Sequence, residues 1–262
     1  QGATAKERNI VLTVEMDGNY KENRNLLYRT FPIKRTGNMQ YIESGEAKTI
    51  EYEVESIIPG ATTGVVRDYT ISLKCTDPYF KDLADIEVVM ASWVNDFYFP
   101  ACFPEEGRIF GHREADLVKE IENDSGADNI GIVVIFRADG AVKNPAIYHA
   151  ESGEFTKVGY LDNDFTMASG QYVIINTYTG KKNVYLLDGV TQAEIESYKN
   201  AYGVIDWDTV IEKFGTVINE YLDEDGDFIQ LQDGTNTLTY SADEGTNYLS
   251  VSVYYRISYL GV

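Results

Sequence analysis

The second half of the chain consists largely of short segments in which apolar and polar residues alternate, and turn signals separate them. Alternation with a period of two is typical of half-buried β-strands. We predict strands over residues 116–123, 129–138, 146–150, 155–161, 170–178, 182–189, 227–234, 236–242 and 247–260. The intervening turns contain dipeptides that end in glycine and suit turns with positive φ: Asp139-Gly140, Thr179-Gly180, Asp188-Gly189 and Asp233-Gly234. Many short strands with frequent turns predict a β-sandwich or jelly roll.

Residues 1–76 predict a strand, one short helix and three further strands. Ile10, Leu12 and Val14 share one face of the first strand, over residues 8–15. A helix is expected between residues 19 and 31, because Leu and Phe recur there at helical spacing before a proline. The following strands are expected at residues 40–44, 49–58 and 68–75, where polar and apolar side chains alternate.

A segment rich in aromatic residues and prolines, residues 77–113, breaks both periodicities and is interpreted as a domain junction. We therefore predict two domains, 1–85 and 86–262. Within the second, Thr191 and Glu194 have the spacing of a capping box, which predicts a helix over residues 192–201. Another short helix is expected over residues 206–215, where either Asp206 or Asp208 could form the cap. Both lie in a loop between strands.

The charge of the chain limits its partners. Its 262 residues include 42 acidic and 22 basic side chains, giving a formal net charge of −20. Such a charge repels phosphate backbones, so nucleic acid is not expected as a partner. It also opposes self-association, so an oligomer would need a dedicated, well-packed interface. No apolar run approaches the roughly 18 to 20 residues that span a bilayer, so no membrane spanning is expected.

Few residues are candidates for catalysis or metal binding. His112 and His149 are the two histidines, and neither lies in a recognisable catalytic motif. Cys75 and Cys102 are interpreted as buried free thiols, since their spacing fits no redox or zinc motif. The acidic turn at residues 223–227 fails the spacing of an EF-hand loop. We therefore expect no enzyme activity and assign no catalytic, metal or cofactor-binding residues; ligand-binding residues stay unknown.

Tyrosine is unusually frequent, with 20 residues. Tyrosine suits pleated, half-buried surfaces, and it also lines surfaces that bind sugars or proteins. The chain opens with Gln1 in place of an initiator Met, so we interpret it as a processed or truncated product. Its first residues show no signal-peptide pattern.

Eight segments of the chain carry a family resemblance. Four lie in the first part: GATAKERNIVLTV, NRNLLYRTFPIK, IEYEVESI and SLKCTDPYFKD. Four follow in the second part: IVVIFRADGAVKNPAIYHAESGE, GQYVIINTYTGKKNVYLLDG, LQDGTNTLTYSA and SVYYRISYLGV. Together they resemble the distal tail protein family of long-tailed bacteriophages. The first four resemble the later part and the close of its ring-forming domain, and the second four follow in the order of its C-terminal galectin-like domain. Two departures stand out: strands that precede the RNIVLTV-like segment in the family are missing, and the insertion at residues 191–221 is longer than expected.

The resemblance implies a mostly β chain with two domains: a β-rich ring-forming domain with one short helix, and a galectin-like β-sandwich with a helical insertion. It implies a homo-oligomer, a hexameric ring in the full-length form, at the virion tail tip and made in the bacterial host cytoplasm. Expected partners are the tail tube, the tape-measure protein and the tail-associated lysin or fibre. A carbohydrate-binding module that contacts a host surface saccharide is the alternative function. A glycoside hydrolase or esterase on a β-sandwich is the third hypothesis.

Overall fold

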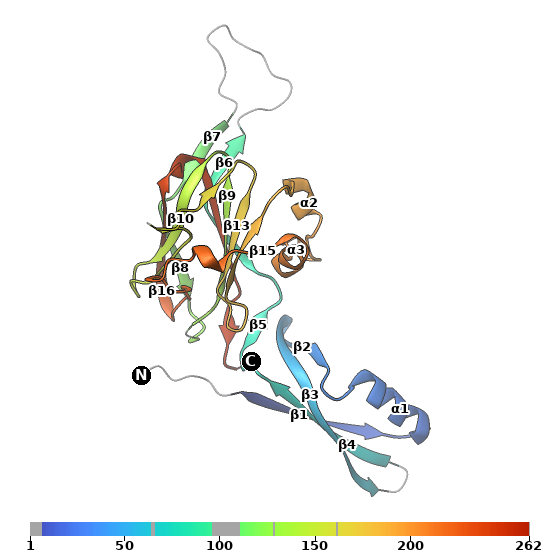
Figure 1. The fold of residues 1–262 in the computed structure, drawn as a ribbon. Helices are drawn as coiled ribbons and strands as arrows, with labels where there is room; N and C mark the ends of the chain where they lie inside the picture. The colour runs from blue at the N-terminus through green and yellow to red at the C-terminus, as the bar shows by residue number, and fades with distance from the viewer. Residues whose placement is uncertain (1–6, 64–65, 96–110, 128, 161, 262) are drawn as a thin grey trace. The chain divides into compact units, whose positions relative to one another are not determined.

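The computed structural model describes residues 7–63, 66–95, 111–127, 129–160 and 162–261 (Figure 1). The chain divides into two compact units, and each is described by itself. Unit 1 contains Gln1–Leu83 together with Ser258–Val262, and unit 2 contains Ala84–Ile257. Both consist mainly of antiparallel strands, so the prediction of a mostly β, two-domain chain is confirmed.

In its described residues, unit 1 contains one antiparallel sheet of six strands and one helix, α1 (Tyr20–Thr30). The strands run in the order β1 (Arg8–Met16), β4 (Val66–Cys75), β3 (Glu46–Thr63), β5 (Phe80–Asp82) and β18 (Ser258–Tyr259), and β2 (Thr36–Glu43) pairs with β3. The last strand comes from the C-terminal residues, so the chain leaves unit 1 after Leu83 and returns to it at Ser258.

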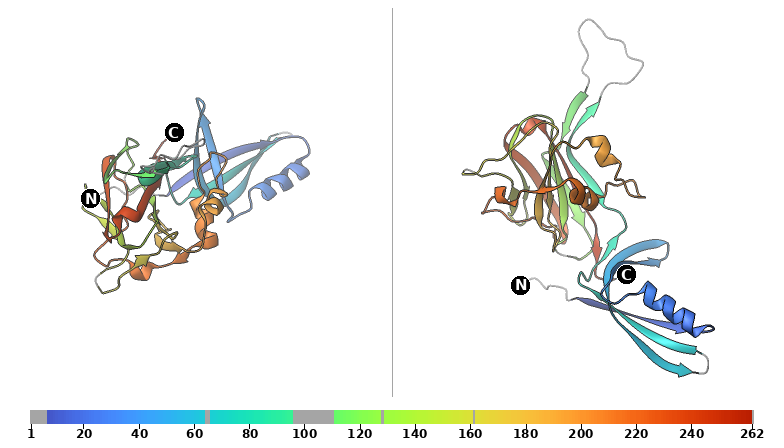
Figure 2. Two further views of the ribbon diagram at one scale, coloured as in Figure 1. Left: turned by 90° about the horizontal axis from the view of Figure 1, so that it is seen from above. Right: turned by 45° about the vertical axis from the view of Figure 1, so that its right-hand side comes forward.

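Side-chain alternation determines which face of this sheet is covered. Tyr69, Ile71 and Leu73 of β4 are almost fully buried and pack with Leu27 of α1 in one apolar cluster. The intervening side chains point to the other face, because successive residues of a strand alternate between faces. The turned view in Figure 2 shows α1 lying along one side of the sheet. Within the described residues of unit 1, no helix covers the opposite face.

Unit 2 is a β-sandwich with a helical layer. Its smaller sheet contains β11 (Phe155–Lys157), β10 (Val142–His149), β16 (Gly234–Glu244) and β8 (Val118–Asn123), and β12 (Thr166–Met167) pairs with β10. The larger sheet runs β15 (Thr216–Val217), β14 (Asn183–Leu187), β13 (Tyr172–Asn176), β9 (Ile132–Ala138), β17 (Leu249–Tyr255), β6 (Ile86–Asn95) and β7 (Gly111–Ala115).

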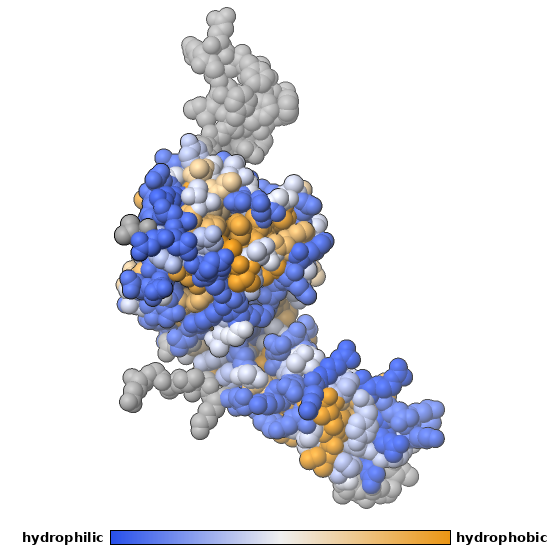
Figure 3. Space-filling model, viewed as in Figure 1, coloured by the Kyte–Doolittle hydropathy of each residue, from blue (hydrophilic) through white to orange (hydrophobic). Residues whose placement is uncertain are grey.

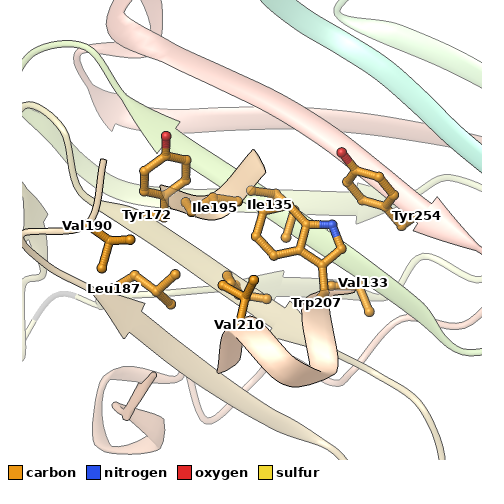
Figure 4. Packing of buried hydrophobic residues seen from close by; sticks show 10 residues of the cluster. Val133, Ile135, Tyr172, Leu187, Val190, Ile195, Trp207, Val210 and Tyr254 are labelled. Atoms are coloured by element: carbon orange, nitrogen blue, oxygen red, sulfur yellow. The ribbon is translucent and has the colours of Figure 1, made fainter. Parts of the chain in front are cut away.

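The central strands of the larger sheet are buried on both faces. Val134 and Phe136 of β9 are fully buried, and their neighbours Val133 and Ile135, which point to the other face, are 7% and 5% exposed. Val133 and Ile135 belong to a cluster with residues of two helices, α2 (Gln192–Glu196) and α3 (Trp207–Phe214) (Figure 4). The insertion between β14 and β15 therefore forms a third layer over this sheet. Two short 3-10 helices, η1 (Asn219–Tyr221) and η2 (Thr246–Tyr248), complete the unit.

Three sequence predictions need correction. The segment at residues 77–113 is not only a junction, because β5 and the ten-residue strand β6 lie within it. The helix predicted over residues 192–201 ends at Glu196. Beyond it the chain turns back, Lys199 forms an isolated bridge with Ile205, and the Asn200 side chain accepts from the amides of Tyr202 and Val204. Residues 227–233 form no strand and contribute only an isolated bridge between Ile130 and Leu231.

Two details of the capping prediction are confirmed. The Thr191 hydroxyl accepts from the Glu194 amide, and the Glu194 carboxylate accepts from the Thr191 amide, so the capping box closes the start of α2. Asp206 caps α3 by accepting from the amide of Thr209.

The assignment of unit 1 as a ring-forming domain and of unit 2 as a galectin-like domain stays a prediction.

Candidate interaction surface

His149 lies in a buried hydrogen-bond cluster. Its imidazole is fully buried; Nδ1 lies 2.8 Å from the Ser152 hydroxyl, and Nε2 lies 3.0 Å from Oδ1 of Asn236. The Asn236 amide nitrogen donates to backbone carbonyls, including those of Gln232 and Gly234, so its oxygen must accept from His149. Nε2 therefore carries a proton. His149 and Ser152 are residue types that occur in catalytic dyads, but a fully buried imidazole cannot reach a substrate. We therefore assign this cluster no catalytic role.

The remaining sequence candidates also lack a reactive setting. Cys75 is a free thiol with no exposed surface, and burial raises its pKa, so the thiolate is disfavoured. In the acidic turn, Asp223 and Asp227 accept hydrogen bonds from the amides of Asp225 and Phe228. No group of three metal-ligating side chains occurs among the described residues. His112 and Cys102 lie outside the residues whose side chains the structure describes.

Strand β1 forms an edge of the unit 1 sheet. All nine of its residues, Arg8 to Met16, pair with β4 on one side. On its other side no strand of the described chain pairs with it. Such an edge presents a row of backbone N–H and C=O groups that another strand can bind. Its length makes it a candidate assembly site, since proteins commonly protect long edges.

Exposed apolar side chains are concentrated in unit 1. Of 15 large exposed apolar residues in the described chain, eight belong to this unit, although it contains only about a third of the residues. These are Val11, Leu26, Tyr28, Ile33, Tyr41, Ile42, Ile58 and Leu260. Figure 3 shows an apolar patch within the hydrophilic surface of this unit, at the lower right of the view. Exposed apolar surface of this kind marks a candidate interface.

The open face of the unit 1 sheet combines apolar and polar groups. Val11 and Ile58 point to this face and are each 59% exposed. Between them, the Ser72 hydroxyl lies 2.7 Å from the Glu55 carboxylate and 3.0 Å from Oδ1 of Asn9. Mixed surfaces like this are typical of protein–protein interfaces, in which polar groups provide specificity. We use the name open edge of unit 1 for strand β1 together with this face of the sheet, which includes Asn9, Val11, Glu55, Ile58 and Ser72.

Comparison with known proteins identifies the fold. No family model and no curated protein sequence matches the chain. Among solved structures, the Dit protein of phage SPP1 matches over 98% of this chain and 80% of its own, with a TM-score of 0.54 and 13% identity. The chain has the fold of a phage Dit protein. That protein's structure is described as a paradigm of the hub adsorption apparatus in phages that infect Gram-positive bacteria.

The phage P2 baseplate, in its activated conformation, also matches in two structures. The TM-scores are 0.47 and 0.43 at 10% identity, over 97% and 95% of this chain and 80% and 78% of the matched chain. The resemblance to distal tail proteins predicted from the sequence is thus confirmed at the level of the fold by the Dit structure. No helix in the described residues is long and apolar enough to span a bilayer.

Proposed function

We propose that the chain is a structural hub at the tail tip of a long-tailed phage or prophage. Unit 1 assembles copies into a ring, expected to be hexameric in the full-length form, and the second unit projects outward. The observation that carries the proposal is the nine-residue edge of β1, which has no second partner strand among the described residues and carries exposed Val11. The Dit-like fold over nearly the whole chain supports the same function.

The proposed mechanism is physical. A ring is a closed assembly in which every subunit uses the same two surfaces, so closure leaves no unpaired edge. If the open edge of unit 1 meets a complementary surface of the next copy, the backbone groups of β1 gain partners and the apolar side chains leave water. The interface is proposed to include the strands at residues 8–15 and 66–76.

The ring would join the tail tube to the parts that act on the host. In this proposal the tube and tape-measure protein meet one side of the ring, and the tail-associated lysin or fibre meets the other. The hub is made in the host cytoplasm and reaches the virion tail tip by assembly. It supplies positioning and no catalysis, which agrees with the buried settings of His149 and Cys75.

The solution mass tests this proposal. Light scattering is measured on the full-length gene product, with the 262-residue chain alongside, across a salt series. The charge of −20 repels neighbouring copies, so added salt should strengthen the ring. We expect a hexameric mass for the full-length product that becomes more stable with salt. A monomer under all conditions would contradict the proposal.

A further inference from the structure

The segment that contains α1 is basic, although the chain as a whole is strongly acidic. Residues 20–35 hold five cationic side chains and one carboxylate, Glu22, in a protein of net charge −20. The cations are Lys21, Arg24, Arg29, Lys34 and Arg35. None of the five forms an ion pair with a carboxylate in the described part of the chain, whereas lysines and arginines elsewhere in both units do. Their carboxylate partners are therefore expected outside the subunit.

Exposed apolar side chains accompany these cations. Leu26, Tyr28 and Ile33 are 63%, 41% and 56% exposed. The helix packs on the sheet through buried Leu27, so these three side chains lie away from the contact with the sheet. Lys21 lies in the first turn of α1, and a second cation lies in its last turn. We use the name basic helix face for Lys21, Leu26, Tyr28, Arg29, Ile33 and Lys34.

The open face of the unit 1 sheet has apolar side chains in its middle. Val11 lies opposite Ser72, and Ile58 lies opposite Thr70. Ser72 and Thr70 are the two middle positions of the outward-facing side of β4, because side chains alternate along the strand and Tyr69 faces the helix. The exposed apolar groups of the open face are thus central, as they are on the basic helix face.

Carboxylates lie at both ends of the open face. At one end, Glu15 lies directly opposite Asp68 across β1 and β4, and neither forms an ion pair within the described residues. Like charges in this position repel each other. At the other end, β3 contributes three carboxylates at alternate positions: Glu51, Glu53 and Glu55. The one lysine at that end, Lys74, already pairs with Glu7 at 3.0 Å.

The two surfaces match in spacing as well as in charge. Lys21 and Arg29 are eight residues apart in a helix, which is about 12 Å at about 1.5 Å per residue. Asp68 and Ser72 are four residues apart in a strand, which is about 14 Å at about 3.4 Å per residue. The Ser72 hydroxyl donates to Glu55, so the latter spacing also separates the two groups of carboxylates. When the cations lie over the carboxylates, the apolar middles of the two surfaces meet as well.

We propose that the basic helix face of one copy docks on the open edge of unit 1 of the next copy. This inference rests on the proposed ring and names the surface that the open edge meets. Head-to-tail rings need two different surfaces on each subunit, and α1 lies on the side of the sheet opposite the open face (Figure 2). The contact pairs lie closer together than the Debye length, about 10 Å at 0.1 M salt. Salt therefore weakens the longer-range repulsion between copies more than it weakens these pairs.

Charge-reversal variants of the full-length product test the contact by light scattering. The face variant combines Glu15→Lys with Glu51→Lys, and the helix variant combines Lys21→Glu with Arg29→Glu. Each variant places like charges on both surfaces, so we expect each to weaken self-association about a hundredfold. An equimolar mixture should recover the hexameric mass, because each variant offers the surface that the other has lost. The two variants then alternate around an even-numbered ring.

Exposed residues of unit 2 provide matched controls for net charge. Glu120→Lys with Glu224→Lys makes the same charge change as the face variant, and Lys182→Glu with Lys199→Glu makes the same change as the helix variant. Both controls should keep the wild-type mass. Every substituted side chain is exposed, so urea unfolding should show wild-type stability for all four variants.

The combined chain gives a second test in one molecule. It carries all four substitutions of the face and helix variants, which restores opposite charges on the two surfaces, and it should be hexameric. A helix variant that keeps the wild-type hexamer would overturn the inference, and so would a monomeric combined chain. A wild-type product that is itself monomeric would instead contradict the proposed function, whereas a wild-type hexamer insensitive to these reversals would contradict only the contact through α1.

Discussion

The indole ring of Trp207 lies edge-on against the phenol ring of Tyr254, with their centroids 5.6 Å apart. Trp207 begins α3, and Tyr254 lies in β17 of the larger sheet, so this contact attaches the helical insertion to the sandwich. Both side chains are buried, at 6% and 5% exposure (Figure 4). Edge-to-face aromatic pairs add stabilisation beyond the area that they bury.

Replacing Trp207 should therefore destabilise unit 2. We expect Trp207→Ala to lower the free energy of unfolding by about 3 to 5 kcal/mol, because it removes a large buried side chain and leaves a cavity. Trp207→Phe keeps an aromatic ring and should cost less. Urea unfolding followed by circular dichroism measures both. A loss below about 1 kcal/mol for the alanine variant would show that α3 is held by other contacts.

Asn144 joins three segments of unit 2. It is 2% exposed and has a φ of 48°, in the left-handed region that Asn tolerates better than most residues. Its side-chain nitrogen donates to Asp164 at 2.9 Å and to Asp243 at 2.8 Å, and its oxygen accepts from the Phe165 amide at 2.8 Å. The side chain therefore holds the loop before β12 against β16.

Two substitutions at this position separate hydrogen bonding from backbone strain. Asn144→Ala loses all three hydrogen bonds. It also places at positive φ an alanine, which tolerates this backbone conformation less well than asparagine does. We therefore expect it to lose about 2 to 3 kcal/mol of stability. Asn144→Gly loses the same bonds without the steric strain and should be the more stable of the two. Urea unfolding gives the order. An alanine variant as stable as the glycine variant would contradict the role assigned to the backbone.

The pH dependence of stability should reveal the lowered pKa of the Asp243 carboxyl. Hydrogen bonds from Asn144 and Lys157 hold the pKa of this carboxyl below its ordinary value. A lowered folded-state pKa contributes stability above the unfolded value, about 3.9, and this is lost as the pH falls through the folded value. The stability advantage of the wild type over Asp243→Asn should be constant at neutral pH and shrink below about pH 4. An advantage that stays constant down to pH 2 would contradict the lowered pKa.

Local patterns in the sequence predicted much of the fold. Alternation predicted β1, β3 and β4, and the caps at Thr191 and Asp206 fixed the starts of both insertion helices. The prediction that Cys75 is a buried free thiol is also confirmed. These features depend on neighbouring residues, which is why local patterns reveal them.

Features that depend on distant residues were not predicted. Phe80 pairs with Tyr259 within unit 1, although all residues of unit 2 lie between them in the sequence. No local pattern indicates this pairing. β6 was hidden within a segment rich in prolines and aromatics. The interface through the strands at residues 8–15 and 66–76 stays a proposal.

A matched pair of charge substitutions tests assembly through unit 1. Val11→Glu places a carboxylate on the open edge, where Val11 is 59% exposed, and would bury a charge in the proposed interface. Val217→Glu makes the same change on β15 of unit 2, where the side chain is 50% exposed. Both side chains are exposed, so neither change should unfold the chain. The decisive measurement is the light-scattering mass of these two variants of the full-length product. We predict that Val11→Glu is monomeric while Val217→Glu remains hexameric. A hexamer that survives Val11→Glu and dissociates with Val217→Glu would show that the copies meet through unit 2 and contradict the account.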